Sequence, residues 1–351
     1  MSNPKIEGFC YTPETGIKYQ LYQACALALN GAEGLGFYGV EPLQGGQLLE
    51  SQGNMEIYDK SVVAKLSHLD LDTNDSFVFK MDILNDEPRM AANEIQFLRS
   101  VTPTIVQELQ GQGYSIVTPV VLYDAITQER PWMIETFIEG TPVSKEYYGL
   151  EPGVLTAKHI EGICAFIKAC SAFDLDRAQQ NGLDLQEEDC FESFTRNLDM
   201  YGKSAVIDAI GEELYSQLST LLTHLRPIFA RQTRVLGLGD VITNNMIKIS
   251  DDSLGIFDFT SLHSTNNPAY DYGYMAESLS IDPDLQSYFV RTALEMNRDV
   301  PEFKDLLWAT FIYSGCINRV RRAHRDGNEA QILQCKEQIE MALSGQGAWS
   351  N

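Results

Sequence analysis

Basic residues are scarce in this sequence, and long apolar runs are missing. The 351 residues include 26 Lys and Arg against 49 Asp and Glu, which gives a formal net charge of −23 at pH 7. A negative field of this size repels nucleic acids and anionic membranes, so we expect neither as a partner. No run approaches the ~20 apolar residues that cross a bilayer. Residues 1–10 also lack the apolar core of a secretory signal, so we expect a cytoplasmic protein.

Cysteine pairs and the common nucleotide-binding fingerprints are also missing. The seven cysteines are scattered, with no Cys-x-x-Cys pair and no Cys/His ligand spacing. This spacing argues against a zinc site and favours reduced thiols. No Gly-x-x-x-x-Gly-Lys-Ser/Thr segment occurs, and strand patterns do not alternate with helical ones, which argues against a P-loop or Rossmann enzyme. No feature of the sequence indicates an oligomeric state.

The sequence does contain a series of strand patterns followed by a helical region. An amphipathic helix is predicted over 15–29, and a second one, inserted among the strands, over 88–101. The strand patterns cover 37–43, 55–58, 61–71, 76–84, 116–123 and 132–138. Residues 139–142 form a predicted linker, and the rest is mostly helical apart from a small hairpin. We therefore predict an α+β protein with two lobes. Residues 1–138 form an N-terminal antiparallel sheet with one inserted helix, and residues 139–351 form a larger, mostly helical lobe.

The segment from Gly239 to Phe259 holds the most informative pattern. An apolar stretch leads to Gly239-Asp240, Asn245 follows five positions after the Asp, and a second apolar strand ends in Asp258-Phe259. A carboxylate on a loop after a strand is suited to orient a hydroxyl or accept its proton. Amide and carboxylate oxygens, such as those of Asn245 and Asp258, are suitable Mg²⁺ ligands. Phosphoryl transfer requires this combination, because its chemistry is mostly positioning and charge neutralisation.

Together with Pro268-Ala269-Tyr270-Asp271, this pattern resembles the aminoglycoside phosphotransferase and choline kinase-like family. That family has the protein kinase fold and mostly phosphorylates hydroxyls of small molecules with ATP and Mg²⁺. The resemblance implies that Asp240 is the catalytic base and that Asn245 and Asp258 hold the metal. It gives Asp271 a structural role, in which this residue braces the catalytic loop from the start of the next helix.

The resemblance extends upstream into the predicted nucleotide-binding lobe. Lys80, within Phe79-Lys80-Met81, resembles the strand lysine that pairs with the α- and β-phosphates. Glu94 resembles the helix glutamate that pairs with that lysine. Lys65, on the preceding strand, is the alternative phosphate lysine. Lys80 is preferred because its strand directly precedes the helix that carries Glu94.

Two further segments resemble nucleotide-contacting parts of the family. Gly45-Gly46 resembles the loop that covers the phosphates, where glycines let the backbone approach closely, although a plain Gly-rich turn is an equal alternative. The segment 134–140 resembles the linker between the lobes. The resemblance implies that the Glu135 carbonyl and the Phe137 amide meet adenine through backbone atoms. The sequence does not distinguish ATP from GTP.

Leu238 is the one departure from the family pattern, because the family usually has His at this position. Three interpretations follow. The first is an active kinase with a small-molecule acceptor, for which the negative charge favours a cation such as an aminoglycoside or an amino alcohol. The second is a pseudokinase that binds nucleotide without transfer. The third is a kinase for protein Ser or Thr, which the short segment 260–267 disfavours because it leaves little platform for a peptide.

Two weaker candidates for the acceptor cleft are His263 and the acidic run 187–189. The histidine follows Asp258 closely along the chain, and the acidic run is suited to attract an amine. The alternatives are a core histidine with satisfied hydrogen bonds and a solvated helix start.

Overall fold

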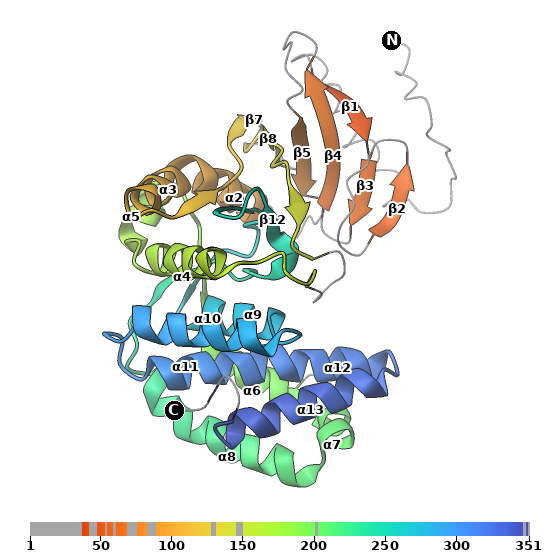
Figure 1. Ribbon diagram of the computed structural model, residues 1–351, viewed down its shortest axis with the longest axis vertical. Coiled ribbons are helices and arrows are strands. Elements are labelled where there is room, and N and C mark those ends of the chain that lie inside the picture. Colours follow the sequence, from red (N-terminus) through yellow and green to blue (C-terminus); the bar gives the residue numbers. More distant parts are fainter. Residues whose placement is uncertain are drawn as a thin grey trace.

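A computed structural model gives the architecture of the protein (Figure 1). It describes residues 37–41, 48–52, 55–58, 61–68, 76–82, 89–127, 131–144, 150–200, 203–346 and 349. The predicted helix over 15–29 and the predicted Gly45-Gly46 loop lie outside these residues. The structure has the predicted α+β class, with an antiparallel sheet in the N-terminal part and a mostly helical C-terminal part.

Among the described residues the N-terminal sheet has seven strands, and their pairings are all antiparallel. Its order is β2-β3-β4-β5-β8-β7, and β1 also pairs with β4. The bounds are β1 (Phe37–Glu41), β2 (Leu48–Gln52), β3 (Met55–Tyr58), β4 (Ser61–His68), β5 (Phe77–Asp82), β7 (Val121–Asp124) and β8 (Trp132–Thr136). In β5, Phe77 and Phe79 are buried whereas Lys80 is half-buried, as the period of two predicts. Lys80 therefore lies on the more open face of the sheet.

In the part of the chain described between β5 and β7 there are two helices, whereas a single one was predicted. α2 (Arg89–Ser100) matches the predicted helix, and α3 (Thr102–Gly111) follows it directly, with a proline in its first turn. The predicted strand over 116–123 is divided into β6 (Ser115–Val117) and β7. Pro119 lies between them and has no N–H to continue a ladder. β6 pairs with β13 (Ser253–Ile256) outside the N-terminal sheet.

The C-terminal part is built mainly of helices, most of which lie at the end of the molecule away from the N-terminal sheet in Figure 1. They are α4 (Ala157–Ser171), α5 (Leu175–Gln180), α6 (Cys190–Thr195), α7 (Lys203–Ile210), α8 (Glu212–Phe229), α9 (Tyr270–Ser278), α10 (Pro283–Met296), α11 (Phe303–Thr310), α12 (Ile317–Arg325) and α13 (Glu329–Leu343). A π-helical segment, Phe311–Cys316, joins α11 to α12. No helix in the described part of the chain is long and apolar enough to cross a membrane.

Two small sheets carry the segments of the sequence motif. One has the order β10-β14-β11, with β10 (Gln186–Glu188), β14 (His263–Thr265) and β11 (Val235–Gly237). The other has the order β6-β13-β12-β9, with β9 (Thr141–Pro142) and β12 (Met246–Lys248). The predicted hairpin is the β12–β13 pair, in which Ile247 lies opposite Gly255. The loop after β11 and the segment after β13 are thereby brought to one place.

Candidate active site

Lys80 lies between two carboxylates that come from distant parts of the chain. Its Nζ atom is 2.9 and 2.8 Å from the two carboxylate oxygens of Glu94 on α2, and 2.6 Å from Oδ1 of Asp258, which follows β13. The Phe259 amide also donates to Glu94 Oε1 at 2.8 Å. Burial opposes the charge on Lys80, but the Asp258 and Glu94 carboxylates outweigh it and raise the pKa of Lys80. The arrangement ties β5, α2 and the Asp-Phe segment together.

Lys65, the alternative phosphate lysine, is placed differently. Its Nζ atom lies over the Phe137 ring, 4.6 Å from the ring centroid. In the β4–β5 ladder, Lys65 lies opposite Val78, and Lys80 lies opposite Val63. The ion pair with Glu94 is made by Lys80, as the preferred prediction requires.

The predicted contact between the Phe137 amide and adenine is contradicted by the sheet pairing. The Phe137 N–H donates to the Ser76 carbonyl oxygen at 3.1 Å, and Glu135 pairs with Val78 in the β5–β8 ladder. A backbone donor that is already paired in a sheet is not available to a base. The prediction placed the linker too early, because pairing with β5 continues beyond β8 as far as Phe137. The Gly45 and Gly46 contacts lie outside the described residues.

The side chain of Glu135, rather than its backbone, is the distinctive group on this strand. It is only 6% exposed, and its Oε2 atom has no hydrogen-bond partner among the described residues. Burial and the nearby Glu94 carboxylate raise the pKa of Glu135 to about 8, although Lys80 acts in the opposite direction. Burial likewise raises the pKa of Glu94. The carboxyl groups of Glu94, Glu135 and Asp258 therefore all act on the charge of Lys80.

Asp271, at the start of α9, holds the loop that contains Asp240. Its Oδ2 accepts from the Leu238 amide at 2.9 Å, and its Oδ1 accepts from the Gly239 amide at 2.8 Å. This bracing role was predicted from the sequence and is confirmed. Gly239 has φ +83°, and a Cβ there would clash with the Ser261 carbonyl oxygen. Leu238 packs into the core with 1% exposure, so the loop is held although the motif histidine is absent.

Asn245, at the end of this loop, and Asp258, after β13, both carry side-chain oxygen atoms of the kind that binds metals. The Asn245 side-chain amide donates to the Asp240 carbonyl oxygen at 2.9 Å, which leaves its Oδ1 as the atom for a cation. Asp258 has φ +65°, a conformation that is rare for residues other than glycine and is found at functional sites. Its Oδ1 also accepts from the Thr260 hydroxyl at 3.1 Å. An amide oxygen and a carboxylate fit Mg²⁺, which takes few protein ligands and completes its shell with water and phosphate.

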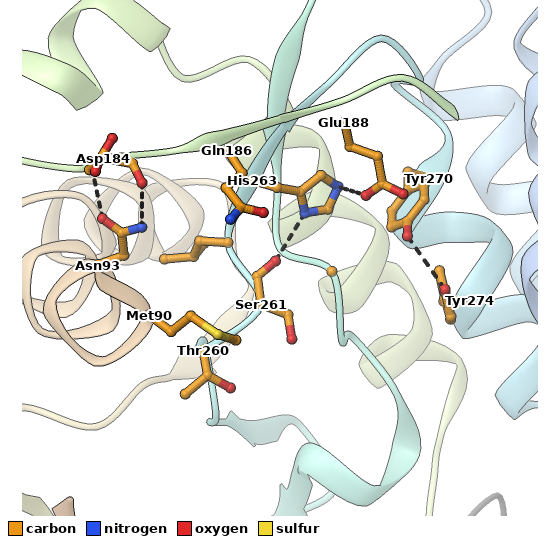
Figure 2. Close-up of a pocket in the computed structure, with 12 residues that line it drawn as sticks. Met90, Asn93, Asp184, Gln186, Glu188, Thr260, Ser261, His263, Tyr270 and Tyr274 are labelled. Carbon is orange, nitrogen blue, oxygen red and sulfur yellow. Dashed lines mark hydrogen bonds and ion pairs between the residues drawn. The ribbon is translucent and has the colours of Figure 1, made fainter. Parts of the chain in front are cut away.

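A cavity of about 310 Å³ opens beside the loop, next to Gly239 (Figure 2). It is lined by Met90, Asn93, Asp184, Gln186, Glu188, Gly239, Thr260, Ser261, Leu262, His263, Tyr270 and Tyr274. One wall is fixed by Asn93, whose side chain exchanges two hydrogen bonds with the Asp184 backbone, at 2.8 and 2.7 Å. The polar lining and the two carboxylates suit a hydrophilic ligand that carries positive charge.

His263 forms another wall of this cavity. Its Nδ1 lies 2.9 Å from the Ser261 carbonyl oxygen and its Nε2 lies 3.5 Å from Glu188 Oε2 (Figure 2). Because a carbonyl oxygen only accepts, Nδ1 carries the hydrogen in that contact. The imidazole also packs edge-on against Tyr270, with the ring centroids 4.8 Å apart. His263 and Glu188 were weak candidates in the sequence, and both line the cavity.

Sequence reasoning missed Tyr270 and Tyr274 as lining residues. Tyr270 was part of a family motif but was given no role, and Tyr274 follows it by one helical turn on α9. Their hydroxyl oxygens are 3.4 Å apart, and burial raises the pKa of Tyr274 to about 12. The spacing of four residues on a helix was the available signal, since such residues share a face.

Comparison with known proteins identifies the fold. No protein-family model matches the chain, and no curated protein matches it in sequence. The solved GDP complex of wild-type aminoglycoside 2'-phosphotransferase-IIIa is 16% identical, covers 92% of this chain and 98% of its own, and superposes with a TM-score of 0.61. The chain has the fold of the aminoglycoside phosphotransferases.

Two other solved structures share this phosphotransferase fold. Macrolide 2'-phosphotransferase MphH from Brachybacterium faecium, an apoenzyme, is 14% identical, with coverage of 83% and 90% and a TM-score of 0.53. Amicoumacin kinase hAmiN, in complex with AMP-PNP, Ca²⁺ and Ami, is 11% identical, with coverage of 93% and 96% and a TM-score of 0.52. At such identities the likeness establishes the fold, whereas activity depends on the residues at the site.

Proposed function

We propose that this protein is a kinase that moves the γ-phosphate of ATP to a hydroxyl group of a small molecule. The observation that carries the proposal is the position of Lys80, which is ion-paired with both Glu94 and Asp258. A cation held between a helix glutamate and an aspartate after a strand is the phosphate grip that kinase-type transfer requires. Residues 1–138 and 139–351 are proposed as the two lobes, with the nucleotide between them.

Each polar residue of the site has a distinct part in the proposed reaction. Lys80, steadied by Glu94, holds the α- and β-phosphates. Asn245 and Asp258 hold Mg²⁺, which when bound neutralises the charge that develops on the phosphates. Asp240 orients the acceptor hydroxyl and takes its proton. The hydroxyl oxygen bonds to the γ-phosphorus, the bond from that phosphorus to the β-bridging oxygen breaks, and ADP leaves.

The acceptor is proposed to bind in the cavity beside Gly239. This cavity adjoins the residue that precedes Asp240, and its lining carboxylates, Asp184 and Glu188, favour an amine-bearing compound. An aminoglycoside or an amino alcohol has the required hydroxyl and charge. A protein acceptor is disfavoured, because residues 260–267 include β14 and lead directly to α9. Little chain is left there to hold a peptide.

The second candidate is a nucleotide-binding protein without transfer activity. It is favoured by Leu238, which stands where the family usually has His. The structure weakens this reading, because Leu238 is buried and its amide still bonds to Asp271. The loop is therefore held by the backbone, without the usual histidine.

Phosphorus NMR distinguishes the two candidates. The protein is mixed with ATP, Mg²⁺ and one compound at a time from a panel of aminoglycosides, amino alcohols and neutral sugars. The kinase reading predicts a new phosphomonoester signal with at least one amine-bearing hydroxyl compound. Nucleotide binding by calorimetry, with no phosphomonoester formed from any acceptor in the panel, would support the sensor instead.

A further inference from the structure

The loop that contains Asp240 is held at its far end as well as at its near end. At the near end, the Asp271 carboxylate accepts hydrogen bonds from the two amides that precede Asp240. At the far end, the Thr243 amide donates to the Ser278 hydroxyl oxygen at 3.0 Å, and the hydroxyl oxygens of these two residues are 2.6 Å apart. The sequence motif predicted the contact of Asp271 and gave Ser278 no role.

One face of α9 supplies both contacts. Asp271 and Ser278 are seven residues apart on this helix, which is almost two turns. Their side chains therefore lie on the same face, separated by about 10 Å along the helix axis. The helix spans the loop from Gly239 to Thr243 and has a hydrogen-bonding group at each end. Asp240 lies between the two ends that are held.

The end of α9 that carries Ser278 is itself fixed by a buried arginine. Arg319 on α12 is 4% exposed, and its side chain donates to the Glu277 carbonyl oxygen and to the Ser280 hydroxyl oxygen, each at 3.2 Å. It also forms an ion pair with the Glu277 carboxylate. Arg319 thus binds residues on both sides of Ser278, which sets the position of the Ser278 hydroxyl group.

The contact between Ser278 and Thr243 is buried, and it provides a partner that the loop needs. Both residues are 0% exposed. Thr243 is the first residue of the short 3₁₀ helix Thr243–Asn245, and the preceding Ile242 makes no side-chain hydrogen bond that caps this helix. The first N–H groups of a helix lack partners within it. Because the position is closed to solvent, the acceptor for the Thr243 amide has to come from the protein, and Ser278 supplies it.

The same short helix relates two residues of the proposed reaction to each other. It ends at Asn245, whose side-chain amide donates to the Asp240 carbonyl oxygen at 2.9 Å. The backbone amide of Asn245 donates to the Ile242 carbonyl oxygen at 3.0 Å. A shift of Thr243 is therefore passed to Asn245 on one side and to Asp240 on the other.

We propose that Ser278 is a positioning residue for phosphoryl transfer, which acts through Thr243 to hold Asp240 and Asn245 in their reacting positions. This inference rests on the proposed function, because it uses the roles given there to Asp240 and Asn245. Ser278 is fully buried and does not line the acceptor cavity. Its loss should therefore lower the rate of transfer and leave the affinity for ATP nearly unchanged.

Steady-state kinetics of four variants of the full chain, with the acceptor found by phosphorus NMR, tests the proposal. Ser278→Ala removes the acceptor of the Thr243 amide. Thr243→Val removes one hydroxyl group and keeps the amide, whereas Thr243→Ser keeps both. The matched control is Thr292→Val on α10, a helix that carries none of the residues assigned to the reaction. Thr292 is also buried, and its hydroxyl donates to the Tyr288 carbonyl oxygen at 2.8 Å.

Ser278→Ala should lower kcat about tenfold and keep the Kd for ATP within about threefold of the wild type. Thr243→Val should lower kcat by a smaller factor, and Thr243→Ser and Thr292→Val should stay within about twofold. Hydrogen exchange followed by mass spectrometry gives a second readout. Residues 240–245 should exchange at least about tenfold faster in Ser278→Ala than in the wild type, and at the wild-type rate in Thr292→Val.

If Ser278→Ala has the same kcat as Thr292→Val, the inference is overturned and the proposed function is left intact. If Ser278→Ala does not fold, the two Thr243 variants decide, and equal kcat values for them overturn the inference. Rapid exchange of residues 240–245 in the folded wild type also overturns it, because the loop is then not held. If the wild type transfers no phosphate to any acceptor, the proposed function fails and the inference fails with it.

Discussion

Lys80 and Asp258 are 178 positions apart in the sequence, yet their side chains meet at 2.6 Å. One belongs to β5 and the other follows β13, so the contact depends on the correct docking of the N-terminal sheet on the C-terminal helices. Glu94 shares the same lysine. Lys80 therefore holds together the two carboxylates to which the proposed reaction gives different roles.

Replacing Lys80 by Ala should weaken both the fold and nucleotide binding. The substitution leaves Glu94 buried without its counter-charge, which typically costs about 3–5 kcal/mol. Urea unfolding should show this loss, and calorimetry should show a large fall in ATP affinity. Lys158→Ala is the control, because Lys158 is 45% exposed and pairs with the surface residue Asp252. If Lys80→Ala binds ATP as tightly as the control does, the assignment of Lys80 as the phosphate-binding lysine is contradicted.

Removing the Asp271 carboxylate, which holds the loop that contains Asp240, should lower kcat more than it lowers the affinity for ATP. Asp271→Ala leaves the Leu238 and Gly239 amides without their acceptor, at roughly 1–3 kcal/mol for each buried donor. Asp240 then loses its position, whereas Lys80 is untouched. We expect kcat to fall at least about tenfold with a small change in ATP affinity. The rescue variant Asp271→Asn, which keeps one oxygen acceptor, should lie between the wild type and Ala; equal kcat in all three would refute the brace.

Protonation of Glu135 makes the stability of the fold depend on pH. The carboxyl titrates near 4.5 when unfolded and near 8 when folded, so the folded state binds the extra proton between these values. This group's contribution to stability is present below about pH 4.5 and is lost as the pH rises to about 8, at up to about 1.4 kcal/mol per pH unit. Urea unfolding from pH 5.5 to 9 should show this slope in the wild type and a shallower one in Glu135→Gln. If the free energy of unfolding depends on pH in the same way in both proteins, the raised pKa of Glu135 is contradicted.

Much of the site could be predicted from the sequence because its key residues stand in fixed local patterns. The spacing of Gly239, Asp240 and Asn245 and the position of Asp271 follow from a strand, a loop and a helix start. Lys80 and Glu94 were also predictable, because a strand lysine and the next helix are neighbours in both sequence and space.

Other features depended on long-range pairing that local patterns do not encode. The face on which Glu135 lies is set by strand register, and a shift of one residue would reverse it. The cavity forms because β10 pairs with β14, which joins segments about 75 residues apart. α3 was missed because Pro103, at its first turn, was not read as a helix start. The division of the chain at residue 138 stays a prediction.

Changing the cavity wall should alter acceptor binding without altering nucleotide binding. His263→Ala removes the imidazole that faces Glu188, and Glu188→Gln removes one of the two lining carboxylates. Once an amine-bearing acceptor is found, both variants should raise its KM by about tenfold, with ATP affinity unchanged. Glu187→Gln is the matched control, because Glu187 is 72% exposed and does not line the cavity. If the variants and the control have the same KM, the acceptor binds elsewhere.

The most direct test of phosphotransfer is the rate of phosphomonoester formation by the wild type and by Asp240→Asn, with ATP affinity measured in parallel. The substitution keeps the size of the side chain but removes the carboxylate that takes the hydroxyl proton, so kcat should fall by about 10²–10⁴ while ATP affinity stays within about threefold. Asp252→Asn, at an exposed aspartate, is the control and should match the wild type. Undiminished transfer by Asp240→Asn would contradict the central claim.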